Sequence, residues 1–115
     1  VTVPGSASSQ SEILDLGTYA LTSASSKVVV ETCVMQIIPT ATAVFDFGLY
    51  ADSEVSPRDN AQFDVTSSNV NTVFASFEFA PGDTSSRHYY IKVQQISAAG
   101  FTVNACTGVL KEVSG

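Results

Sequence analysis

Residues Ser86–Gly108 have the sequence SRHYYIKVQQISAAGFTVNACTG, in which apolar and polar side chains alternate on both sides of a short turn. The apolar positions of this alternation are Tyr89, Ile91, Val93, Phe101, Val103 and Ala105. Successive side chains of a strand point to opposite faces, so alternation is typical of a half-buried β-strand. The segment Ser97–Gly100 suits a type I turn that closes with a glycine at positive φ. We therefore expect one long antiparallel hairpin with an apolar inner face.

Similar strand patterns recur along the chain about every 8 to 12 residues, and helical periodicity is absent. The other expected strands are 12–21, 27–38, 43–50, 62–65, 72–80 and 109–113. Gly17 indicates a kink or bulge in the first of these, and the second is apolar on both parities, which favours a strand that is buried on both faces or crosses between sheets. The predicted core comprises Phe45, Phe47, Phe77, Phe79, Ile91, Val93, Phe101 and Val103. The predicted fold class is all-β, an antiparallel β-sandwich or jelly roll of seven or eight strands.

Composition limits the classes of function. The chain has 115 residues, of which 14% are charged and 44% apolar, as expected for one β-rich domain with a neutral outer face. Its net charge is −6 and it has five Lys and Arg residues in all, too few for the basic patch that phosphate binding requires. No run approaches the roughly 20 apolar residues of a membrane-spanning helix. We expect neither nucleic acid binding nor a membrane span.

The N-terminal residues 1–11, VTVPGSASSQS, differ in composition from the rest of the chain. Small polar residues have little reason to pack on themselves, so we expect an extended arm followed by a single β-sandwich domain at residues 12–115. The segment Val1–Pro4 is predicted to hydrogen-bond along a sheet edge of its own chain or of a neighbouring chain, with the neighbour favoured. Because Val1 is not a natural start, we expect a processed protein or a fragment.

The two cysteines are a candidate disulfide, Cys33–Cys106. Such a bond would suit an extracellular sandwich and would stabilise it by roughly 4 kcal/mol in the chain-entropy model. The parity argues against it, because Cys106 shares the polar parity of Thr102 and Asn104 and is expected to point outward. The alternative is two free thiols, one buried and one exposed.

No pattern indicates catalysis or metal binding. The chain has a single histidine, His88, on an expected outward face, and it lacks the Gly-x-Ser-x-Gly motif of a serine hydrolase. One histidine and two distant cysteines fall short of the four ligands usual for zinc. The acidic loop Ala51–Asn60 could offer oxygens to calcium, but its spacing matches no EF-hand loop and a solvated turn is expected. We therefore predict no enzyme activity, no catalytic or metal-ligating residue and no cofactor.

Tyr50, Tyr90 and His88 form the candidate recognition surface, since all three have outward parities beside polar neighbours. A tyrosine ring can anchor a protein contact or stack on a sugar. Protein contact is the expected use, and carbohydrate binding is the alternative.

The stretch Tyr90–Val103, YIKVQQISAAGFTV, resembles the closing hairpin of small β-sandwich domains in bacteriophage virion surface proteins, both tail-fibre and head-decoration proteins. It is also similar to the end of H-type lectin-like domains, although the tryptophan often found there is missing. The resemblance covers fourteen residues and transfers no functional residue. It implies a component of a virion or of a surface fibre.

These observations favour a non-enzymatic structural or decorating module of an extracellular assembly, with a virion surface component as the leading hypothesis. Its expected partners are proteins, either copies of itself or other virion or fibre subunits, and its expected location is extracellular or on the virion surface. The alternative is a carbohydrate-binding or adhesin domain of a secreted or tail-fibre protein.

Overall fold

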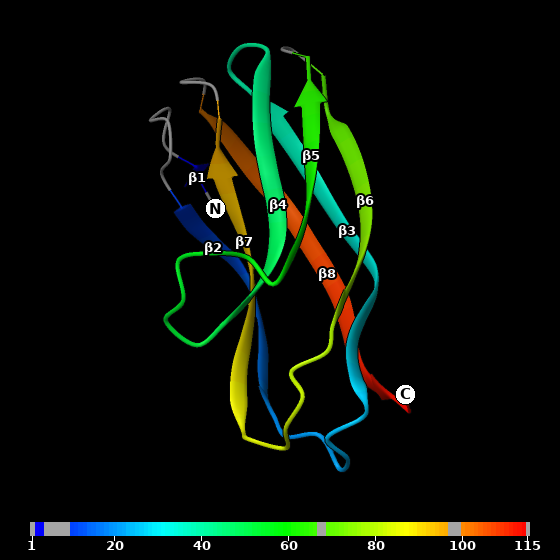
Figure 1. Ribbon diagram of the computed structural model, residues 1–115. Helices are drawn as coiled ribbons and strands as arrows, with labels where there is room; N and C mark the ends of the chain where they lie inside the picture. The colour runs from blue at the N-terminus through cyan, green and yellow to red at the C-terminus, as the bar shows by residue number, and fades with distance from the viewer. Residues whose placement is uncertain (1, 4–9, 67–68, 97–99, 115) are drawn as a thin grey trace.

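The computed structural model describes residues 2–3, 10–66, 69–96 and 100–114 (Figure 1). Every element of regular secondary structure in these ranges is a β-strand, which confirms the predicted all-β class. The strands are β1 (Thr2–Val3), β2 (Gln10–Tyr19), β3 (Lys27–Pro39), β4 (Ala43–Ala51), β5 (Asp59–Val65), β6 (Asn71–Phe79), β7 (Arg87–Gln95) and β8 (Phe101–Val113). Within the same ranges there is no helix that could cross a membrane.

The strands form two four-stranded antiparallel sheets that pack face to face (Figure 1). Their strand orders are β1-β8-β3-β6 and β2-β7-β4-β5. Apart from β4 and β5, consecutive strands lie in different sheets, so the chain repeatedly crosses from one sheet to the other. This arrangement of eight strands in two Greek keys is a jelly roll, one of the two predicted architectures.

The predicted hairpin at Ser86–Gly108 is wrong. β7 pairs with β2 and β4 in one sheet, whereas β8 pairs with β1 and β3 in the other. Alternation specifies which face of a strand is buried but does not specify its hydrogen-bonded neighbour, so the two inner faces meet across the core instead. Residues 97–99 of the predicted turn lie outside the described residues. The separate strand expected at 109–113 is the continuation of β8.

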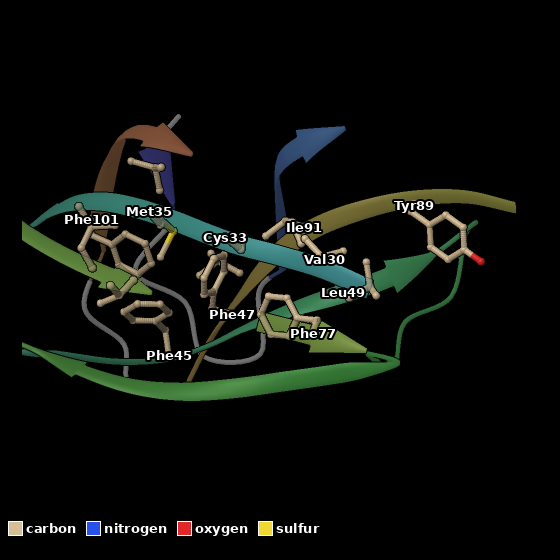
Figure 2. Close-up of a cluster of buried hydrophobic side chains, with 14 of the residues drawn as sticks. Val30, Cys33, Met35, Phe45, Phe47, Leu49, Phe77, Tyr89, Ile91 and Phe101 are labelled. Carbon is tan, nitrogen blue, oxygen red and sulfur yellow. The ribbon is translucent and has the colours of Figure 1, made fainter. Parts of the chain in front are cut away.

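The core lies between the sheets and is rich in phenylalanine (Figure 2). Phe45 of β4 packs on Phe101 of β8 with ring centroids 5.0 Å apart, and Phe47 meets Phe77 of β6 edge to face at 5.4 Å. Each pair joins one sheet to the other, and offset or edge-to-face rings add to the free energy of burial. The predicted core is confirmed, with Phe79 partly buried at its margin.

Bulges in β3 and β8 keep the inner faces of these long strands apolar. Between Glu31 and Val34 of β3, two residues face one residue of β8, and Asn104 is the extra residue in β8. A bulge adds one residue to one strand, so the inward parity shifts by one position. β3 is therefore neither buried on both faces nor shared between the sheets, the two readings of its sequence. Val28, Val30, Cys33, Met35 and Ile37 point inward on either side of the bulge, whereas Val29, Val34 and Ile38 lie on the outer face.

Two details near the N-terminus agree with the sequence. Gly17 has a φ of 84° and lies at a register shift in β2, where its N–H donates to the Asp15 carboxylate at 2.8 Å. Thr2 and Val3 of the arm pair with Thr102 and Phe101. These two residues thus lie along the sheet edge of their own chain, not along that of the favoured neighbour, and Gln10 and Ser11 of the predicted arm belong to β2. Val1 and Pro4 lie outside the described residues.

Glu112, near the end of β8, anchors the loop between β2 and β3. Its carboxylate accepts hydrogen bonds from the Thr22 N–H at 3.0 Å, from the Thr22 hydroxyl at 2.8 Å and from the Tyr19 hydroxyl at 3.2 Å. The Thr22 N–H, followed by the Thr22 hydroxyl, lowers the pKa of Glu112 from 4.5 to about 2. The ionised carboxylate is therefore the form that favours the folded state.

Phe77→Ala should lower the free energy of unfolding by about 3–5 kcal/mol, because it removes a buried ring and leaves a cavity against Phe47. Phe74→Ala on the same strand is the matched control, since the Phe74 side chain points to solvent. Chemical denaturation of both variants measures the difference. Equal stability of the two would contradict the core assignment.

Glu112→Gln should destabilise the protein at neutral pH, and the difference from the wild type should shrink as the pH falls. A lowered carboxyl pKa contributes stability above the unfolded value of 4.5, and this stability is lost as the pH falls toward about 2. Thermal melts of both proteins between pH 7 and pH 2 test this. A difference that does not depend on pH would contradict it.

Candidate interaction surfaces

His88 and Tyr90 lie on the outer face of the β2-β7-β4-β5 sheet. Their rings stack with centroids 4.3 Å apart and 7° between planes. The His88 Nε2 atom lies 2.5 Å from a carboxylate oxygen of Asp15, on the neighbouring strand β2. The imidazole of His88, with the N–H of Gly17 second, lowers the pKa of Asp15. The sequence thus predicted that both rings lie on an outward face, but it did not predict that they stack on each other.

The contact between Asp15 and His88 resembles the pair that orients a catalytic base. A general base takes a proton from a nucleophile, a water molecule or a substrate within hydrogen-bond reach. Both cysteines lie in the other sheet, and the contacts of the His88 ring are with Asp15 and Tyr90. The arrangement holds the His88 ring between the Asp15 carboxylate and the Tyr90 ring on the outer face of the sheet.

Lys92 lies between the two tyrosines of the predicted recognition surface. Its Nζ atom is 5.1 Å from the ring centroid of Tyr50 and 5.6 Å from that of Tyr90. An ammonium group over an aromatic face is attracted by the ring electrons. Tyr90 therefore has His88 stacked on its ring and a cation nearby, which leaves the ring poorly placed to stack on a sugar.

Tyr50 is not exposed, and this part of the prediction is wrong. Only 1% of its surface is accessible, and burial, followed by the charge of Asp46, raises its pKa. The loop between β4 and β5 folds back over this face of the sheet (Figure 1), and the Gln10 side chain donates to the carbonyl of Val55 at 2.7 Å. Gly48 permits the close approach, because a Cβ there would lie 3.2 Å from the Cβ of Pro57 in this loop and 2.9 Å from the carbonyl oxygen of Asp59, where β5 begins. Parity alone could not reveal that a loop covers the outward side chains.

The carboxylates of the acidic loop at Ala51–Asn60 have separate partners. Among the described residues, no group of three or more His, Cys, Asp or Glu side chains is placed to hold a metal ion. The partners are the backbone N–H of His88 for Asp52, the Arg58 side chain for Glu54 and the backbone N–H of Glu78 for Asp59. These contacts stabilise the loop and its packing on neighbouring strands.

Cys33 and Cys106 lie next to each other in the core, and both thiols are free. The expectation that Cys106 points outward is wrong, because the bulge at Asn104 reverses the parity of β8 and directs Cys106 inward. The hydrogen bond between the thiols, with burial second, raises the pKa of Cys33, and the same hydrogen bond lowers that of Cys106. The parity argument against a disulfide therefore no longer holds.

The outer face of the β1-β8-β3-β6 sheet carries an apolar patch that the sequence analysis missed. Phe74 of β6, which is 65% exposed, lies directly opposite Val34 of β3. Val109 of β8, 64% exposed, is two residues from Thr107, the partner of Val34 on its other side. We call Val34, Phe74 and Val109 the apolar patch. The signal was present in the strand TVFASFEFA, where Phe74 occupies an outward position among polar residues.

Charged pairs border the apolar patch. Lys111 of β8 binds Glu31 of β3 at 2.7 Å, and Lys27 of β3 binds Glu78 of β6 at 3.1 Å. Both pairs are exposed and join neighbouring strands, so they contribute little to stability. Because each cation on this face has its own carboxylate, the face presents apolar groups within a charge-balanced border.

Gln95 is a second residue that the sequence did not single out. It lies at an inward position of β7, it is 1% exposed, and its amide has no hydrogen-bond partner among the described residues. A buried amide without a partner costs about 1–3 kcal/mol. The sequence did contain a signal of this burial, because Gln95 has the same parity along the strand as the inward residues Ile91 and Val93.

No protein-family model matches the sequence, and no curated protein is significantly similar to it. The class of the protein therefore follows from the structure alone: a small all-β jelly roll with one outer face covered by a loop and the other partly apolar.

Proposed function

We propose that the protein is a non-enzymatic structural or decorating module of an extracellular assembly, as a component of a virion surface. The apolar patch is the observation that carries the proposal. Contiguous exposed apolar groups with a polar rim are typical of protein contact surfaces. An aromatic side chain such as Phe74 is the kind of group that anchors such contacts.

The architecture agrees with this role by analogy. Jelly rolls recur in viral capsid and lectin domains, although a fold by itself does not define a function. The alternative of carbohydrate binding depended on exposed tyrosines, and Tyr50 is buried while Tyr90 is stacked on His88. The observations therefore favour protein partners over sugars.

An extracellular location has a chemical consequence for Cys33 and Cys106. Oxidising compartments permit structural disulfides, and the two thiols are already in contact. Reaction with a disulfide oxidant such as oxidised glutathione would form the S–S bond, transfer two electrons to the oxidant and release it as two thiols. The bond would close a long loop and stabilise the domain by about 4 kcal/mol in the chain-entropy model.

We expect protein recovered from the extracellular assembly to be lighter by two hydrogen atoms than its reduced form in intact-mass spectrometry. It should also resist alkylation by iodoacetamide when unfolded without reductant. The Cys106→Ser variant is the control for thiol counting. Two alkylated cysteines in the untreated wild type would contradict the oxidised form.

The assembly role is tested by sedimentation of the tagged protein from its producing culture on a density gradient. The wild type should travel with fast-sedimenting particles, because the apolar patch is covered by partner subunits. Phe74→Ser should return it to the slow fractions without loss of folding, since that side chain is exposed. Val55→Ser, a change at a 74% exposed loop residue, is the matched control and should sediment as the wild type does.

Wild-type protein found only as a free, slowly sedimenting species would overturn the proposal. Binding of that free species to an immobilised glycan panel would favour the carbohydrate alternative.

A further inference from the structure

The thiols of Cys33 and Cys106 differ in how far the fold buries them. Cys33 lies in β3, between β8 and β6, and its side chain is 0% exposed. Cys106 lies in β8 opposite Met35, and it is only partly buried at the margin of the core. Cys106 is therefore the thiol that an external reagent can approach more easily while the fold is intact.

Gly108 of β8 leaves the room in which the two sulfur atoms meet. It faces the bulge of β3 that contains Cys33. A Cβ at Gly108 would lie 3.5 Å from the Cys33 sulfur and 3.3 Å from a methyl group of Val30. Because no side chain stands there, the Cys33 sulfur can contact that of Cys106, two residues earlier in β8. Thiol–disulfide exchange within one chain requires such a contact, since the second thiol must reach the first.

The hydrogen bond between the sulfur atoms gives the two thiols different acidities. The Cys33 S–H donates to the Cys106 sulfur, and this bond lowers the pKa of Cys106. The same bond, with burial second, raises the pKa of Cys33. The thiolate, not the thiol, attacks a disulfide. The more accessible sulfur is thus also the one whose reactive form is stabilised.

We propose that Cys106 is the site at which the folded protein reacts with a small disulfide, and that Cys33 then completes the exchange. The Cys106 thiolate attacks one sulfur of the reagent RSSR, which forms a mixed disulfide and releases RS⁻. Cys33 then loses its proton and attacks the Cys106 sulfur, so that the second RS⁻ leaves. The two protein thiols are oxidised by two electrons, and the reagent becomes two RSH molecules that carry the two thiol protons.

This inference rests on the proposed extracellular role for its setting and specifies how the disulfide forms there. The chain folds with free thiols and closes the bond afterwards, when it meets an oxidising compartment. The bond joins β3 to β8, the strands that carry Val34 and Val109 of the apolar patch. A bond made only during folding would leave the same final product, so the test must begin with folded, reduced protein.

The test mixes folded, reduced variants that each keep one cysteine with oxidised glutathione and follows their intact masses. Cys33→Ser should gain one glutathione, because it keeps the attacking thiol and lacks the second one. Cys106→Ser keeps only the buried thiol and is the matched control. It should react more slowly on the order of tenfold or more, because Cys33 must first be exposed by local opening. In urea the two variants should react at similar rates, since the fold no longer shields either thiol.

The wild type gives a readout without mutation, in case a variant fails to fold. The folded, reduced protein is alkylated briefly with iodoacetamide, then unfolded and labelled with a second reagent of different mass. Peptide mapping should find the first label mainly on Cys106 and the second on Cys33.

Equal rates for the two folded variants, or a first label mainly on Cys33, would overturn the assignment of the two roles. Folded wild type that forms no internal disulfide with oxidised glutathione, while protein refolded in its presence does, would overturn exchange in the folded state. Neither result would overturn the assembly role, which the sedimentation of Phe74→Ser tests separately.

Discussion

The two sheets are held together by aromatic rings that meet in the space between them. Phe45 and Phe47 of β4 contact Phe101 and Phe77 of the opposite sheet at centroid distances of 5.0 and 5.4 Å. Backbone hydrogen bonds join strands within a sheet, whereas burial of side chains joins one sheet to the other. Every strand must therefore keep an apolar inner face over its whole length.

This requirement accounts for the bulges in β3 and β8. Each strand spans thirteen residues, and in each the sequence changes parity part of the way along. An extra residue restores the inward direction of the apolar side chains beyond that point. As a consequence Cys33 and Cys106 meet in the core, and a Cβ at Gly108 would lie 3.5 Å from the Cys33 sulfur. Packing between the sheets thus also decides the surroundings of the thiols.

The outer faces of the two sheets differ in how far their side chains are covered by the rest of the chain. On the β2-β7-β4-β5 sheet, the β4–β5 loop buries Tyr50, and charged groups surround the stacked rings of His88 and Tyr90. On the other sheet Phe74 and Val109 are exposed. The chain therefore covers one outer face with its own loop and leaves apolar side chains exposed on the other.

The sequence by itself determined the all-β class, the inward faces of most strands and the bulge at Gly17, because alternation and glycine conformation are local properties. Strand partners, the position of Cys106 and the burial of Tyr50 were decided only by the tertiary structure. The hairpin prediction shows why: the alternation of β7 and β8 is the same whether they pair side by side or face each other across a core. The choice depends on contacts between residues far apart in the chain, and on the bulges and loops that those contacts impose.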